Sequence, residues 1–125
     1  MTVAQYCLLA AIFMPIGCAG IAKAGAFGWH ENRQPRAWLA NQTGWRARAN
    51  AAQANSFEAL PLFLAGLLVA SQNHAAQHTV DTLAAAFVLL RILYVGLYLA
   101  DFAKLRSLVW AGAVACVVSL FFSGS

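Results

Sequence analysis

Four long apolar stretches constrain this chain more than any other feature of its sequence. They cover residues 3–22, 47–70, 79–100 and 105–122, the second beginning with a more polar run. A helix rises about 1.5 Å per residue, so about 20 residues cross a hydrocarbon layer of about 30 Å. Backbone groups in lipid must satisfy their hydrogen bonds within the segment, which favours helices. The sequence therefore predicts a single domain, residues 1–125, that is an all-α integral membrane protein with a four-transmembrane-helix bundle.

The composition supports the same prediction. Hydrophobic residues make up 62% of the chain and charged residues 10%, which is too little charge to cover a soluble domain. A very apolar soluble helical protein is the disfavoured alternative. Residues 3–22 lack the positive start and the small-residue cleavage site of a signal peptide, so we interpret them as a retained span. The three cysteines lie inside spans and are interpreted as small hydrophobic residues rather than disulfide partners: Cys7, Cys18 and Cys116.

The basic residues are distributed by loop, which predicts the topology. The first loop, about Lys23 to Trp45, and the third, about Asp101 to Lys104, carry or adjoin most of the Lys and Arg residues, whereas the second, Ser71 to His78, has none. The positive-inside rule then places loops one and three in the cytoplasm and both termini outside. The net charge of +4 is thereby attributed to topology, and no nucleic-acid partner is expected. The glycines and Pro35 of loop one predict that it is broken by turns rather than helical.

Two charges lie deep inside spans, where each costs about 2.5 to 3.5 kcal/mol on insertion scales. Glu58 is ten residues from Arg48, and Arg91 is ten residues from Asp101. If Arg48 and Asp101 mark the same membrane surface, both buried charges lie about 15 Å deep. The spacing predicts that Glu58 and Arg91 meet as an ion pair.

Further polar residues lie on the same helix faces. Spacings of three, four and seven residues place them on one stripe of each helix, and Arg106 opens the fourth span. Taken singly, each has a structural explanation: an ion pair that locks two helices, tyrosines that pack, or arginines that anchor the surface. Taken together, they predict a polar slot open to the cytoplasm. The residues are Arg48, Asn55 and Glu58 on the second span, Arg91, Tyr94, Tyr98 and Asp101 on the third, and Arg106 on the fourth.

Two sequence runs resemble a known family. Arg48-Ala-Asn-Ala-Ala-Gln-Ala-Asn55-Ser-Phe-Glu58-Ala-Leu-Pro61-Leu-Phe63 contains the Asn-x-x-Glu-x-x-Pro core that is typical of MAPEG proteins, the membrane-associated proteins in eicosanoid and glutathione metabolism. Arg91-Ile-Leu-Tyr94-Val-Gly-Leu-Tyr98, followed by Leu105-Arg106-Ser107, is similar to the family's third and fourth helices. With the four spans, the resemblance covers nearly the whole chain. It is closest to the small bacterial branch, which implies a bacterial inner membrane.

The resemblance implies a homotrimer with glutathione bound between protomers near the cytoplasmic side, and a small lipophilic second substrate. Asn55 and Glu58 would hold the glutathione backbone, with Arg48 at the mouth of the same stripe. Tyr94 and Tyr98 would hydrogen-bond it, Tyr98 also serving as a second donor to the thiol, and Arg91 would support its carboxylate or Glu58. Arg106 would face the thiol. A free thiol has a pKa of about 8.5, and a nearby guanidinium favours the nucleophilic thiolate.

The sequence leaves three functions open. The leading one is a membrane-embedded glutathione-dependent transferase or peroxidase that acts on lipophilic electrophiles. Ala51 and Ala59 depart from the pattern of glutathione-using members, which favours the alternative of a non-catalytic or differently liganded protein with the same fold. A small four-span exporter with Glu58 in its path is the third. No nucleophile-elbow, P-loop, dinucleotide or zinc motif is present, and no metal site is predicted.

Overall fold

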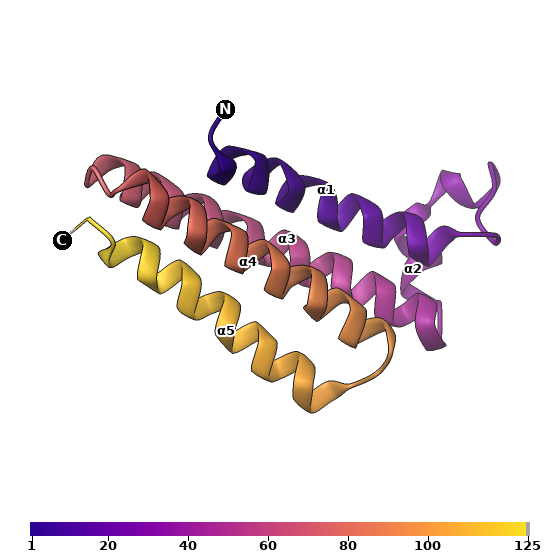
Figure 1. Cartoon of the computed structure of the whole chain (residues 1–125). Coiled ribbons are helices and arrows are strands. Elements are labelled where there is room, and N and C mark those ends of the chain that lie inside the picture. Colours follow the sequence, from indigo (N-terminus) through magenta and orange to yellow (C-terminus); the bar gives the residue numbers. More distant parts are fainter. Residues whose placement is uncertain (125) are drawn as a thin grey trace.

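The computed structural model describes residues 1–124 and contains helices only in that part of the chain (Figure 1). Four long helices are each long and apolar enough to cross a membrane, which confirms the predicted fold class. They are α1 (Val3–Lys23), α3 (Gly44–Gln72), α4 (Gln77–Leu99) and α5 (Ala103–Phe122), and between α1 and α3 lie a short 3-10 helix η1 (Glu31–Arg33) and α2 (Pro35–Ala40).

The helices α3 and α4 form the middle of the bundle. Helix α1 packs against α3 and α4, and α5 packs against α4 and α3 from another side. Both termini lie toward the end where α3 turns into α4, whereas residues 24–43 and the α4–α5 turn lie at the opposite end (Figure 1). We call the latter the loop end. Each of the predicted stripes therefore begins or ends there.

Aromatic stacking and one glycine fix how closely the central helices approach. The rings of Phe63 on α3 and Phe87 on α4 are stacked with centroids 4.1 Å apart, and both side chains are buried. A Cβ added to Gly66 would lie 3.2 Å from Leu120 Cδ1 on α5. Gly66 thus permits a close approach of α3 and α5 that a larger residue would oppose.

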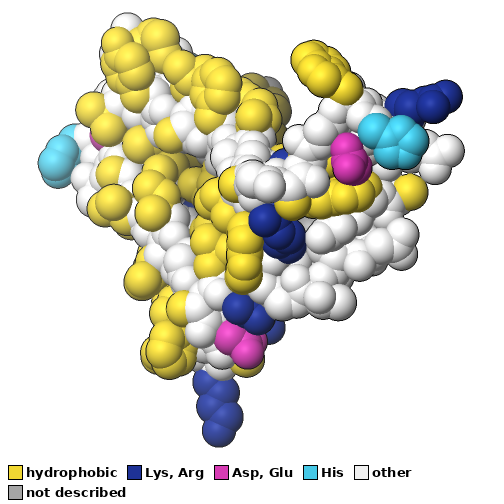
Figure 2. Space-filling view, turned by 90° about the vertical axis from the view of Figure 1, so that its right-hand side faces the viewer, with side chains coloured by type: hydrophobic (Ala, Val, Ile, Leu, Met, Phe, Trp, Pro, Cys, Tyr) yellow, Lys and Arg dark blue, Asp and Glu magenta, His cyan; other side chains and the backbone are white. Residues whose placement is uncertain are grey.

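The outer surface of the bundle is apolar along all four long helices. Large hydrophobic side chains on it are more than half exposed, among them Phe13 at 58%, Leu89 at 67% and Leu108 at 70%. In the end-on view of Figure 2, hydrophobic side chains cover much of the left and upper parts, and Lys and Arg side chains lie at the centre, the upper right and the bottom. A surface of this kind in water would be an aggregation site. Together with helix length, it identifies lipid as the surrounding solvent.

Side chains from neighbouring helices satisfy backbone groups at three helix ends. At the start of α1, the Ala4 N–H donates to Asp81 Oδ1 of α4 at 2.9 Å. At its other end, Arg46 Nη1 of α3 donates to the Ala22 carbonyl at 2.9 Å. Arg48 Nε of α3 donates to the Leu99 carbonyl at the end of α4 at 3.0 Å. These groups would otherwise lack partners in a low-dielectric surrounding.

The long loop is more ordered than its glycines indicate. The prediction that it is not helical is wrong for Pro35–Ala40, which form α2 with the proline at the first helical position, where no N–H is needed. Leu39 of α2 is buried in a small cluster with Ala22 and Ala49. Trp38 meets the ring of Phe27 edge to face, with centroids 5.1 Å apart. The loop is therefore packed onto the loop end of the bundle.

Candidate functional site

A polar pocket of about 210 Å³ lies among α3, α4 and α5 toward the loop end. Of the six described side chains that line it, only Arg106 carries a charge at neutral pH. Four of the seven residues predicted from the sequence as site residues line this pocket, although they come from three helices. The lining residues are Asn55, Tyr94, Tyr98, Arg106, Ser107 and Trp110.

Two phenol rings that line this pocket contact each other, and each also contacts one guanidinium group. The Arg91 guanidinium carbon lies 4.2 Å from the Tyr94 ring centroid, and that of Arg106 lies 3.9 Å from the Tyr98 ring centroid. The two rings meet edge to face at 5.7 Å. We call this row the Arg–Tyr ladder. Cation–π contacts are worth up to about 2 kcal/mol each when desolvated, so the ladder holds the phenol rings and Arg106 in fixed mutual positions.

Arg91 lies behind the pocket rather than in it. Only 2% of its surface is exposed. Its Nη2 donates a long hydrogen bond of 3.4 Å to Ser56 Oγ on α3, and its Nη1 is buried with no partner in residues 1–124. Its guanidinium stacks on Tyr94. Within this chain Arg91 therefore acts on the pocket through Tyr94.

The predicted ion pair between Glu58 and Arg91 is not formed within this chain. Glu58 is exposed on the outer surface of α3, whereas Arg91 is buried and bonded to Ser56. The physical reason is rotation about the helix axis. Residues 56 and 58 differ by about 200° around a helix, and it is Ser56 that faces α4. Arg48 is also outside the pocket lining, with its Nε on the end of α4.

Three buried polar atoms lack hydrogen-bond partners in the described chain. They are Oδ1 of Asn55, Oε1 of Gln53 and Nη1 of Arg91. Buried polar groups are hydrogen-bonded in the great majority of cases, and each exception requires an explanation. Asn55 lines the pocket, so a ligand with an N–H donor would satisfy its acceptor.

Sequence reasoning missed Ser56 and Trp110. Ser56 is a small residue between Asn55 and Glu58 and carries no charge that would single it out. Trp110 was detectable, because it follows Arg106 by four residues and so lies on the same face of α5. It also lines a small apolar cavity of about 20 Å³ beside Arg91, together with Ala59.

The fold and the site together define a class of protein, namely an integral membrane protein with a four-helix bundle and a polar pocket toward one end. The MAPEG family model matches residues 3–124, and the chain therefore belongs to the MAPEG family. No individual curated protein and no solved structure is significantly similar to the chain.

Proposed function

We propose that this protein is a glutathione-dependent transferase or peroxidase that acts on lipophilic electrophiles dissolved in the bilayer. The observation that carries the proposal is the pocket itself. It combines one guanidinium, two phenols and an amide with an unsatisfied acceptor. Membership of a family that includes glutathione-dependent enzymes supports it.

Arg106 is the residue proposed to activate the thiol. Its guanidinium carbon lies over the Tyr98 ring, and none of its side-chain nitrogens donates a hydrogen bond within residues 1–124. Its N–H donors are thus available to a sulfur atom in the pocket. A positive charge there favours the thiolate over the thiol, and the thiolate is the nucleophile. The Tyr98 hydroxyl, which belongs to the same pocket, is proposed as a second hydrogen-bond donor to the thiolate.

The proposed transferase reaction is a nucleophilic substitution in which the glutathione thiolate is the nucleophile. Glutathione loses its thiol proton to water, and the thiolate forms a bond with an electrophilic carbon while a halide or similar group leaves. With a lipid hydroperoxide, two glutathione molecules are oxidised to the disulfide while the O–O bond is reduced to an alcohol and water. The surface of α5 near Arg106 is apolar, because the neighbouring Leu105 and Leu108 are exposed. An apolar surface of this kind suits substrates that are dissolved in lipid.

The remaining predicted residues have separate roles in this proposal. Asn55 accepts an N–H of glutathione, Tyr94 lines the pocket, and Arg91 positions Tyr94. Glu58 faces outward from α3 at bilayer depth. An ionised carboxylate against lipid is costly, so a second copy of the chain covering this face would explain it. This supports the proposed homotrimer, with Glu58 reaching glutathione at the boundary between protomers.

The test measures conjugation of a hydrophobic aromatic halide against pH, together with the ultraviolet absorbance of bound thiolate. Arg106→Ala is expected to move the pH profile to alkaline values and to remove the thiolate absorbance while glutathione still binds. Arg106→Lys is expected to restore only part of the effect, because an ammonium does not reproduce the planar donor set of Arg. Lys104→Ala is the matched control, since Lys104 is an exposed cation two residues away and outside the pocket.

A second candidate is a non-catalytic or differently liganded member of the family. The observation that favours it is the pair of small residues on α3, Ala51 and Ala59, where glutathione-using members carry larger ligand-contacting groups. Wild-type protein that binds no glutathione at millimolar concentration would select this candidate and end the first.

A further inference from the structure

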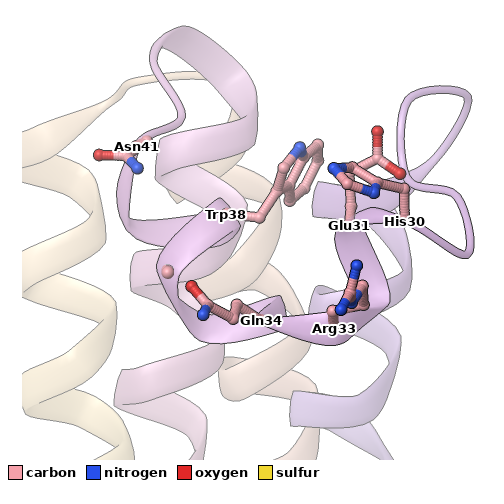
Figure 3. A pocket seen from close by; sticks show the side chains of 7 residues that line it. His30, Glu31, Arg33, Gln34, Trp38 and Asn41 are labelled. Carbon is pink, nitrogen blue, oxygen red and sulfur yellow. The ribbon is translucent and has the colours of Figure 1, made fainter.

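A second polar pocket, distinct from the one above, lies within the loop itself. It is an open depression with a volume of about 400 Å³, and it shares no lining residue with the pocket at Arg106. Figure 3 shows the Trp38 ring on one side and His30, Glu31 and Arg33 on the other. Gln34, Ala37 and Asn41 complete the lining. We call it the loop pocket.

The loop pocket presents one positive and one negative group that do not neutralise each other. The described residues contain no ion pair between Glu31 and Arg33. Glu31 Oε2 accepts the Gly28 N–H at 3.0 Å, which fixes the position of its carboxylate. Arg33 is exposed and its guanidinium has no partner in residues 1–124. A ligand that carries both an anion and an ammonium would satisfy both charges.

The walls of the loop pocket are preorganised by packing. Trp38 is half-buried and is held edge to face by Phe27. Its backbone carbonyl accepts the Gln42 side-chain amide at 2.9 Å, and the neighbouring Leu39 is buried against the bundle. An indole face attracts cations such as an ammonium. Arg33, Glu31 and Trp38 therefore offer separate contacts to a phosphate and to an amine.

The surroundings of the loop pocket are those of a membrane surface. A more apolar hollow of about 280 Å³ is lined by Phe27, Gly28, Trp29 and Asn32, and its Phe27 contacts Trp38 of the loop pocket. Trp29 is 90% exposed, and such indoles settle in the headgroup region. A polar pocket beside an aromatic hollow matches a headgroup followed by the start of its acyl chains.

We propose that the loop pocket binds the headgroup of an amine-bearing phospholipid, with the phosphate on Arg33 and the ammonium on Glu31. Phosphatidylethanolamine has this chemistry. Phosphatidylglycerol lacks the amine, and phosphatidylcholine lacks its N–H donors. A purely electrostatic attraction to the basic residues at this end would instead favour phosphatidylglycerol. Figure 2 shows those Lys and Arg side chains at several places on the loop end.

The test is native mass spectrometry of the purified full chain with phosphatidylethanolamine, phosphatidylglycerol and phosphatidylcholine of identical acyl chains. We expect the first lipid to bind best. Arg33→Gln is expected to weaken its binding about tenfold, the loss of a charge-assisted hydrogen bond. Glu31→Gln is expected to remove the preference for phosphatidylethanolamine over phosphatidylglycerol. Arg36→Gln is the matched control, because Arg36 is an exposed arginine three residues away that does not line the pocket.

Three results would overturn the proposal. The first is equal loss of binding in Arg33→Gln and Arg36→Gln, which would indicate a diffuse basic surface. The second is a wild-type preference for phosphatidylglycerol or equal binding of phosphatidylcholine. The third is binding of soluble phosphoethanolamine as tight as that of the lipid, which would identify a water-soluble ligand. Unchanged thermal unfolding confirms that each variant is folded, and it is expected because Arg33 and Arg36 are exposed and Glu31→Gln keeps an oxygen that can accept the Gly28 N–H.

Discussion

The buried guanidinium of Arg91 gives the sharpest test of the packing described above. Its stacking on Tyr94 at 4.2 Å stabilises the fold by about 2 kcal/mol, and the long 3.4 Å bond to Ser56 adds at most about 1 kcal/mol. Placing an arginine at the centre of a membrane helix costs about 3 kcal/mol on insertion scales. The stabilisation from these two contacts and the cost of burying the charge therefore nearly cancel.

Arg91→Met keeps most of the side-chain volume without the charge. We therefore expect its free energy of unfolding to lie within about 1 kcal/mol of the wild-type value. Arg91→Ala removes the packing as well and is expected to destabilise by about 3 kcal/mol. The assay is reversible unfolding in mixed micelles of increasing denaturing detergent, followed by circular dichroism.

A loss of 3 kcal/mol or more in Arg91→Met would refute this reasoning. It would mean that the guanidinium has a strong partner outside the single chain, such as a carboxylate of a neighbouring protomer or a bound anion on Nη1, the atom that lacks a partner here. Arg91→Met that retains stability but binds glutathione more weakly would support the positioning of Tyr94 by Arg91.

Three further predictions test the bundle and its orientation. A reporter that is active only in the cytoplasm should be inactive when fused to the C-terminus, because the Lys and Arg residues gather at the loop end; an active fusion would reverse the topology. Gly66→Ala should destabilise by about 1 to 3 kcal/mol, because its Cβ would crowd Leu120, whereas Gly96→Ala, with nothing within 4 Å, should not; equal thermal unfolding of the two variants would contradict the close α3–α5 approach. Asp81→Ala should cost about 1 kcal/mol and speed amide hydrogen exchange at Ala4, its partner; unchanged exchange there would show that the contact does not matter.

The depth of the polar residues was predictable from the sequence. Counting residues from Arg48 and Asp101 predicts the same membrane depth for Glu58 and Arg91. Arg48 does lie level with that end of α4, because it donates to the Leu99 carbonyl, two residues before Asp101. Asn55 is seven residues from Arg48 and Tyr94 is seven residues from Asp101, and both line one pocket. Height along a straight helix follows from a constant rise per residue, so these predictions required no tertiary information.

Rotation about the helix axes was not predictable in the same way. A stripe of polar residues shows which ones share a face, but not which neighbour that face meets. Ser56, rather than Glu58, faces Arg91 because the buried stripe of α3 contains small residues such as Ala52 and Ser56. In a span that is apolar all round, hydrophobic periodicity carries no signal to orient the helix. Helix α2 was missed for a different reason, since its stability comes from Leu39 packing on the bundle.

The two attachments of α1 have a consequence for how the protein fits membranes of different thickness. One end of α1 is held by Asp81 and the other by Arg46, so sliding α1 along its neighbours by one turn, about 5.4 Å, would break both bonds at once. The bundle therefore cannot adjust its hydrophobic length by shifting this helix. In a thinner bilayer it must tilt as one body or thin the lipid around it, and the loop end would then change its angle to the membrane surface without changing its internal geometry.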